Sequence, residues 1–218
     1  MARKHGDIES GKLGNKIYYT WHGRQCERSM PTHVANPQTP EQQSHRNAFA
    51  TISKLSSYFK GAHLIGLHWL SVREKNSTYA LFKRINKDCF TLDGEIDYPR
   101  IVVSNGSVPL VTITSAVIED GCLTVNFDSH AYDGAATDRL FLFVYSSALR
   151  AGTLADPVPR SAGRITVDLP TEWLQATSDS TPDDNHAITH SSNQALHLYA
   201  FLQGYRLRTS DTIYRMLQ

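Results

Sequence analysis

The sequence predicts an α+β protein that is mainly β, with two parts that meet near residue 95. From Arg100 onward, apolar residues alternate with polar ones, and this period of two is typical of strands. A marked helix start lies upstream, where Thr39 and Gln42 form a T-x-x-Q capping box. We therefore expect a hairpin and helical module in residues 1–95 and a strand-rich domain in residues 96–218.

A β-hairpin is expected near the N-terminus, after a flexible lead-in that contains Gly11 and Gly14. Two extended runs, residues 16–21 (KIYYTW) and 25–29 (QCERS), flank a connection that contains Gly23. An isolated hairpin is barely stable in water. Its aromatic side chains must therefore pack against the following helix or against a neighbouring subunit, and the sequence leaves both open.

A helix is expected from about Pro40 to Lys60, with Thr39 as N-cap and Gly61 at its end. Apolar residues recur at helical spacing and predict one buried stripe: Phe49, Ile52, Leu55 or Ser56, and Phe59. The apolar run at residues 62–70 reads as a buried strand or extended segment. A second helix is expected over roughly residues 77–87, capped by Asn76 or Ser77.

Seven strands are predicted in the second part, and turn dipeptides such as Asn105-Gly106 and Asp120-Gly121 separate them. Their expected positions are residues 100–104, 111–118, 122–127, 139–146, 164–169, 196–203 and 207–215. Short strands at this spacing favour an immunoglobulin-like or fibronectin-like β-sandwich, although the Cys…Trp…Cys core of antibody domains is missing. A long polar loop is expected over residues 175–194.

Positive charge gathers at the N-terminal end. The whole chain of 218 residues has a formal net charge of +1. Residues 1–60 hold nine Lys and Arg against four Asp and Glu, a net of +5, so residues 61–218 carry 13 against 17, a net of −4. Such a basic segment steers an acidic partner toward it, or is a solvated face without a partner.

Three widely spaced cysteines, Cys26, Cys89 and Cys122, predict no disulfide framework and favour a reducing compartment. No apolar run follows the basic N-terminus, so we expect no secretory signal peptide. We also expect no membrane span, because no 18-residue apolar stretch exists. A cytoplasmic or virion-associated protein is the expectation.

The sequence indicates no catalytic, cofactor or small-molecule site, so we expect a protein that is not an enzyme. His186 and His190, near Asp183 and Asp184, suggest at most an adventitious metal site, and we expect no dedicated metal or cofactor. His63 and His68 read as core histidines. The acidic residues of the 128–138 loop lack the spacing of a calcium-binding loop.

The N-terminal part contains a series of motifs: GKLGN at residues 11–15, YYTWHGR at 18–24, RSMP at 28–31 and NPQTPEQQ at 36–43, followed by Arg46 and Phe49. Together they resemble an uncharacterised bacterial family of unknown function. A related N-P-x-T-x-x-Q-x-x-x-R signature is found in small phage-associated proteins. The resemblance implies a virion or assembly component and supplies no activity.

Three functions remain open, in this order. The first is an assembly protein that docks on other copies or other subunits through its hairpin and helix, with these contact residues: Tyr18, Tyr19, Trp21, Arg24, Arg28, Gln42 and Arg46. The second is nucleic-acid binding, with phosphate contacts from Lys12, Lys16, Arg24, Arg28 and Arg46 and base stacking on the aromatic side chains. The third is a protein-binding or glycan-binding sandwich that uses loops 128–138 and 175–194.

Overall fold

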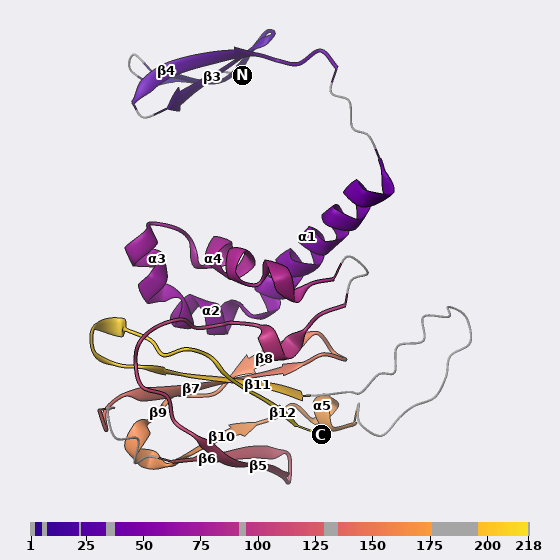
Figure 1. Ribbon diagram of the computed structural model, residues 1–218. Coiled ribbons are helices and arrows are strands. Elements are labelled where there is room, and N and C mark those ends of the chain that lie inside the picture. Colours follow the sequence, from indigo (N-terminus) through magenta and orange to yellow (C-terminus); the bar gives the residue numbers. More distant parts are fainter. Residues whose placement is uncertain are drawn as a thin grey trace, which may run out of the picture. The chain divides into compact units, whose positions relative to one another are not determined.

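The protein divides into two compact units, Met1–Gln42 (unit 1) and Gln43–Gln218 (unit 2), in the computed structural model shown in Figure 1. The structure describes residues 3–5, 8–21, 23–33, 38–91, 95–128, 135–175 and 196–217. This division differs from the expected one at residue 95. The reason is that the helices of unit 2 share a hydrophobic core with its later strands.

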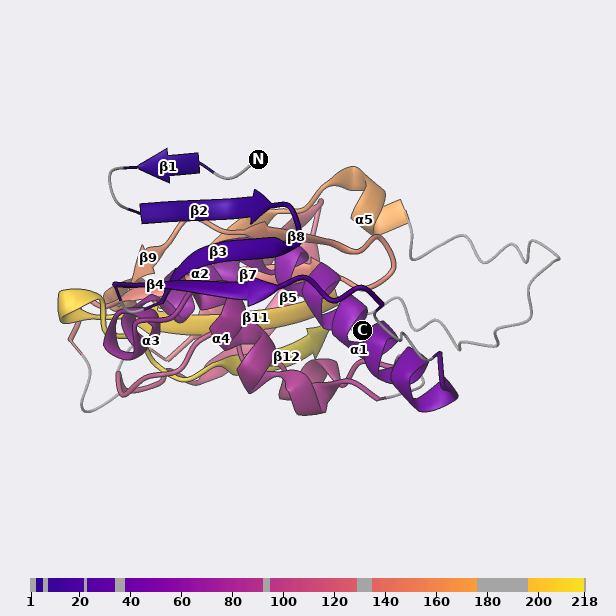
Figure 2. The same cartoon turned by 90° about the horizontal axis from the view of Figure 1, so that it is seen from above.

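Unit 1 contains a four-stranded antiparallel sheet of order β1-β2-β3-β4 (Figure 2). The strands are β1 (Arg3–His5), β2 (Ile8–Leu13), β3 (Lys16–Trp21) and β4 (Arg24–Ser29). The β3–β4 pair confirms the predicted hairpin. The predicted flexible lead-in is wrong, because β2 pairs with β3 through Gly11↔Tyr18. Gly14 lies between β2 and β3 with φ +59, a left-handed conformation that glycine adopts without strain.

Four helices follow: α1 (Pro40–Tyr58), α2 (Lys60–Gly66), α3 (His68–Glu74) and α4 (Thr78–Ile85). The predicted caps are confirmed, since the Thr39 hydroxyl accepts a hydrogen bond from the Gln42 backbone (3.3 Å) and the Ser77 hydroxyl accepts one from Ala80 (3.1 Å). Two short 3₁₀ helices, η1 (Lys87–Cys89) and η2 (Tyr98–Arg100), come next.

The strand predicted over residues 62–70 is wrong, because this run forms α2 and α3. A strand would bury alternate residues. Here burial follows a helical period instead, with Ala62, His63, Gly66, Leu67 and Leu70 buried, while Leu64 is exposed. The stripe predicted on α1 is confirmed at Ile52, Leu55, Ser56 and Phe59, but Phe49 is 60% exposed.

The described residues of unit 2 form eight strands in two antiparallel sheets. They are β5 (Ile113–Glu119), β6 (Cys122–Phe127), β7 (Arg139–Ser146), β8 (Ala151–Leu154), β9 (Val158–Pro159), β10 (Arg164–Asp168), β11 (Leu196–Gln203) and β12 (Ile213–Leu217). One sheet has the order β10-β6-β5, and the other has the order β12-β11-β7-β8, with β9 also paired to β7. The short elements are η3 (Arg160–Ala162), α5 (Thr171–Gln175) and η4 (Tyr205–Leu207).

Most of the predicted strands are confirmed, with three corrections. The last strand begins at Ile213 rather than near residue 207, and β8 and β9 were not predicted. The strand predicted at residues 100–104 is wrong, because side chains rather than a neighbouring strand take up its backbone groups. The Thr212 hydroxyl accepts from the Val103 and Ser104 amides (3.0 and 2.9 Å), and Asn86 bonds both the N–H and the C=O of Val102.

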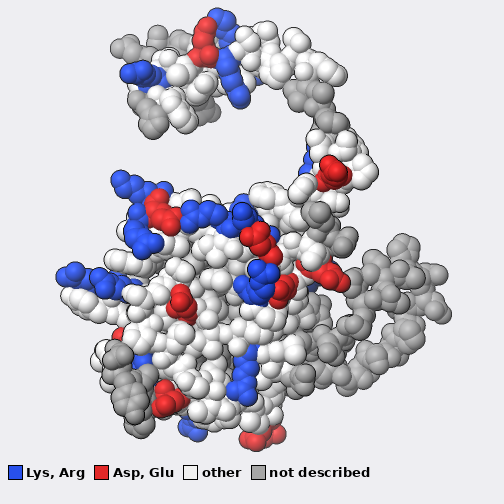
Figure 3. Space-filling view, viewed as in Figure 1, with Lys and Arg blue, Asp and Glu red and all other residues white. Residues whose placement is uncertain are grey.

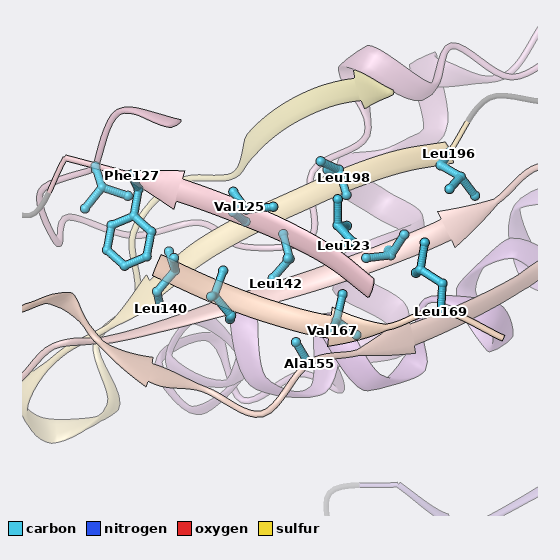
Figure 4. Close-up of a cluster of buried hydrophobic side chains, with 14 of the residues drawn as sticks. Leu123, Val125, Phe127, Leu140, Leu142, Ala155, Val167, Leu169, Leu196 and Leu198 are labelled. Atoms are coloured by element: carbon cyan, nitrogen blue, oxygen red, sulfur yellow. The ribbon is translucent and has the colours of Figure 1, made fainter. Parts of the chain in front are cut away.

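Three layers result within unit 2, with α1–α4 covering one face of the larger sheet and the smaller sheet facing the other (Figure 1). Leucine, valine and phenylalanine side chains of both sheets fill the space between them (Figure 4). Aromatic side chains of β7 and β11 fill the space under the helices. The predicted α+β class is therefore confirmed, whereas the immunoglobulin-like or fibronectin-like topology stays a prediction.

Phe59, at the end of α1, should be the most sensitive apolar position of the helical layer. It is 0% exposed, and its ring centroid lies 4.8–5.8 Å from those of Phe82, Phe143, Tyr145 and Tyr199. We expect Phe59→Ala to lower the free energy of unfolding by about 3–5 kcal/mol in urea denaturation. The matched control is Phe49→Ala, which removes the same ring from an exposed position and should cost less than about 0.5 kcal/mol. Equal losses in the two variants would contradict this account of the core.

Candidate functional site

One face of the unit 1 sheet combines aromatic and basic side chains. Alternate residues of a strand point to the same face, so Ile17, Tyr19 and Trp21 of β3 lie together. The β3–β4 register pairs these three with Arg28, Cys26 and Arg24, and Lys12 of β2 pairs with Ile17. We call this surface the aromatic–basic face: Lys12, Ile17, Tyr19, Trp21, Arg24, Cys26 and Arg28.

A pocket of about 570 Å³ opens on the aromatic–basic face. Its lining residues are Ile17, Tyr19, Trp21, Cys26 and Arg28. Tyr19 is 39% exposed and Trp21 is 63% exposed. Over residues 10–21 and 23–33, none of the described side chains is buried. A sheet gains independent stability from a hydrophobic face or from packing against a helix. This face supplies the apolar surface, and none of its described side chains is buried.

The opposite face of the sheet is different in character. It holds Tyr18 and an ion pair between Lys16 and Glu27, whose charged atoms are 2.9 Å apart. The hydrogen bond from Lys16 to Glu27 raises the pKa of the Lys16 ammonium. Both side chains are about half exposed, and such surface pairs contribute little to stability. Tyr18, which was predicted as a docking contact, and Lys16, which was predicted as a phosphate contact, are thus separated from Tyr19, Trp21, Arg24 and Arg28.

The two remaining predicted contact residues lie on α1 rather than on the sheet. The Gln42 backbone is used in the cap with Thr39. Arg46 is exposed on the second turn of α1 and belongs to unit 2. The sequence placed all seven residues in one group, whereas four of them share the aromatic–basic face.

The histidines divide into described and undescribed positions. His63 is buried, and its Nε2 lies 2.9 Å from the Ser56 carbonyl oxygen, which supports the prediction of a core histidine. His68 is half-buried on α3. His186, His190, Asp183 and Asp184 lie outside the described residues, as do the 175–194 loop beyond Gln175 and residues 129–134 of the 128–138 loop. Within the described ranges, no group of three His, Cys, Asp or Glu residues could hold a metal ion.

A cluster of tyrosines around His197 was not predicted, because its members are far apart in the sequence. The His197 ring stacks on Tyr98 with centroids 4.1 Å apart, and its Nδ1 lies 2.8 Å from the Tyr214 hydroxyl. The Tyr199 hydroxyl donates to the Tyr98 carbonyl at 2.9 Å. Burial raises the pKa of Tyr98, Tyr145 and Tyr199. Since the polar groups bind one another, the cluster holds the 96–100 connection onto the sheet.

The described helices include none that is long and apolar enough to cross a membrane. The cysteines are free, with Cys89 buried and Cys26 and Cys122 half-buried. Burial raises the pKa of the Cys89 thiol. Of the three, Cys26 is the one that lines the pocket of the aromatic–basic face.

Comparison with known proteins gives one family match. The sequence model of DUF6266, described as a family of unknown function, matches residues 8–180. No curated protein matches the chain. One matching solved structure is the spore cortex lytic enzyme SleM of Clostridium perfringens, with 16% identity and a TM-score of 0.31. The match covers 53% of this chain and spans only 29% of the enzyme's chain.

These matches bear on the expectation about enzymatic activity and on the resemblance to a family. The expectation that the protein is not an enzyme is contradicted, because one solved structure that matches the chain is that of an enzyme. A TM-score of 0.31 is nevertheless too low to carry any argument for a lytic or other activity in this chain. The resemblance to a family of unknown function is confirmed and extends far beyond residue 60, whereas the phage resemblance stays a prediction.

The buried His197 predicts a loss of stability in mild acid. Burial lowers its pKa to about 4, below the ordinary 6.5, so the unfolded chain binds the proton more readily than the folded protein. Stability is therefore fully present above pH 6.5 and falls as the pH drops from 6.5 toward 4, by up to about 3 kcal/mol.

Urea denaturation at several pH values tests this expectation. His197→Gln should show a shallower decline between pH 6.5 and 4 than the unmodified protein. His33→Gln, which changes an exposed histidine, is the control and should keep the original decline. Parallel curves for the protein and His197→Gln would show that His197 does not carry the effect.

Proposed function

Because the chain belongs to DUF6266, a family of unknown function, membership supplies no activity, and we propose a function from the protein's own surface. We propose that it is a component of a multi-subunit assembly that docks on neighbouring subunits through the aromatic–basic face of unit 1. Another copy of the chain is the first partner to test.

The observation that carries this proposal is the exposure of Tyr19 and Trp21 around a pocket, in a unit without a buried core among its described side chains. Covering these rings removes apolar surface from water and stabilises the sheet at the same time. Tyrosine, tryptophan and arginine are also the residues that dominate binding energy at protein interfaces. All three types are present on this face.

The sheet also offers an edge for strand addition. β4 is the last strand of the order β1-β2-β3-β4, so its outer backbone groups have no neighbouring strand within this sheet. A partner strand placed there would extend the sheet by main-chain hydrogen bonds, while Arg24, Cys26 and Arg28 supply side-chain contacts. Docking would then use the edge and the face together.

The setting of this assembly follows from the phage resemblance by analogy alone. We extend the proposal to a virion or a comparable particle, with the protein in the cytoplasm or in the particle. In the same proposal, the facing sheets of unit 2 form an immunoglobulin-like or fibronectin-like sandwich that acts as a spacer or surface module.

Oligomer mass tests the docking proposal. Light scattering after size exclusion should give a species heavier than the 24.4 kDa chain. Tyr19→Ser combined with Trp21→Ser should weaken association by about 100-fold, since each aromatic anchor contributes about 1.4 kcal/mol or more. Tyr18→Ser removes an aromatic ring from the opposite face and is the matched control, with little effect on mass.

Alkylation of Cys26 gives an independent reading in the same samples. The thiol lines the pocket, so it should react more slowly in the oligomer than in the double variant, as followed by mass spectrometry. A chain that stays at 24.4 kDa over the whole concentration series would contradict self-docking.

Binding of single-stranded nucleic acid is the second candidate, because Lys12, Arg24 and Arg28 share a face with Tyr19 and Trp21. Cations around exposed rings suit phosphates and stacked bases. Lys16 lies on the opposite face and Arg46 on α1, so the set available on this face is smaller than the sequence suggested.

Fluorescence anisotropy with an oligothymidylate distinguishes this candidate from protein docking. Three phosphate contacts predict a slope of about −2 for the logarithm of the association constant against the logarithm of salt concentration. Arg28→Gln should reduce the slope by about 0.7, whereas Lys16→Gln on the opposite face should leave it unchanged. No binding at low salt would exclude this candidate.

A further inference from the structure

A groove crosses the helical layer of unit 2 between α1 and α4. It has a volume of about 380 Å³, and its apolar lining comes from Ala48, Phe49, Ile52, Ala80 and Phe90. Ile52 is buried and Phe49 is 60% exposed. Ala48 and Ala80 have no side chain beyond Cβ, so they add little bulk where α1 and α4 line the groove. The exposed Phe49 ring is therefore part of an open apolar channel rather than of the core.

Three cations of α4 and η1 line the same groove: Lys83, Arg84 and Lys87. The Lys83 ammonium lies 4.7 Å from the Phe49 ring centroid and 4.1 Å from that of Tyr79. These cation–π contacts hold the charge beside the apolar lining. Arg84 is paired with Glu74 at 2.6 Å. Within the described part of the chain, neither Lys83 nor Lys87 forms an ion pair with a carboxylate.

The helical layer around the groove also carries a net positive charge. Residues 43–91 hold eight Lys and Arg against two Asp and Glu, a net of +6, whereas residues 92–218 hold eight against 15, a net of −7. Figure 3 shows basic side chains gathered over the part of unit 2 where the helices lie. An apolar channel in a basic layer favours a partner that is both apolar and acidic.

We propose that this groove binds an acidic amphipathic helix of a partner protein. Helices form the two long walls, and their backbone groups are hydrogen-bonded internally, so the walls offer no edge to which a strand could add. A segment bound here must satisfy its own backbone, as a helix does. Its apolar side chains at i, i+3 or i+4 would fill the space above Ile52, between Ala48 and Ala80.

The cations fit the polar edge of such a helix. Lys83 is in the last turn of α4 and Lys87 begins η1, four residues further along the chain. Two carboxylates spaced one turn apart on the partner helix match this separation. The site lies wholly in unit 2 and does not depend on the docking function proposed for unit 1.

Selection from a displayed library of random helical peptides tests the proposal on the full-length protein. The enriched peptides should carry apolar residues at i, i+3 or i+4 and i+7, flanked by Asp or Glu. The combined change Lys83→Glu and Lys87→Glu should weaken binding of an enriched peptide at least about tenfold. Ala80→Trp, which fills the groove without a change of charge, should weaken it comparably.

The matched control is Lys54→Glu combined with Lys60→Glu, which makes the same change of net charge at exposed positions outside the groove lining. It should change affinity less than about threefold. Equal effects of the two double variants would show that only the general charge of the layer acts and would overturn the proposal. Failure to enrich any peptide, enrichment of neutral or basic peptides, or preferential binding of an oligonucleotide probe at the groove would also overturn it.

Discussion

The central constraint of this protein is that β7 and β11 are buried on both faces. Their paired residues run from Arg139↔Gln203 to Ser146↔Leu196, and almost every side chain in both strands is buried. Two separate layers are needed to cover such a pair. The smaller sheet packs on one face through aliphatic side chains, and α1–α4 pack on the other through aromatic ones. The arrangement of the rest of unit 2 follows from this requirement.

Polar groups hold the irregular connection between the helices and the sheets. Thr212, Asn86 and the Ser104 hydroxyl, which donates to the Ser210 carbonyl at 2.6 Å, replace the strand partners that residues 101–104 lack. Arg160, only 1% exposed, lies between Asp138, at 3.5 Å, and the Pro109 carbonyl, while its Nε and Nη1 have no hydrogen-bond partner among the described residues. The hydrogen-bonded groups of the connection fix one conformation, because each would be costly if left unpaired.

Two surfaces combine aromatic rings with cations, and they differ in geometry. The aromatic–basic face is a sheet surface beside a strand edge, which suits docking by face and edge together. The α1–α4 groove is a channel between helices, with Lys83 positioned by Phe49 and Tyr79. The two proposed sites therefore differ in binding mode, since one would cover exposed rings beside a strand edge and the other would accept a helix.

The sequence by itself determined the local elements. The Thr39 and Ser77 caps, the β3–β4 hairpin and the alternating strands β6 and β10 depend on neighbouring residues, so short-range patterns were sufficient to predict them. The residue types of the candidate site were also visible, because several aromatic and basic residues are concentrated in residues 16–28.

Only the tertiary structure decided which faces of these elements pack against one another and which stay exposed. The 62–70 run is helical because one side of it packs on the aromatic face of the larger sheet, and its composition alone suits a strand equally well. Strand register placed Lys12, Arg24 and Arg28 on the same face as Tyr19 and Trp21, which no count of charges could show. Phe49 is not part of the buried stripe that was predicted on α1, because its side chain lines an open groove. Burial, register and grooves depend on residues distant in the chain, and the local sequence does not contain that information.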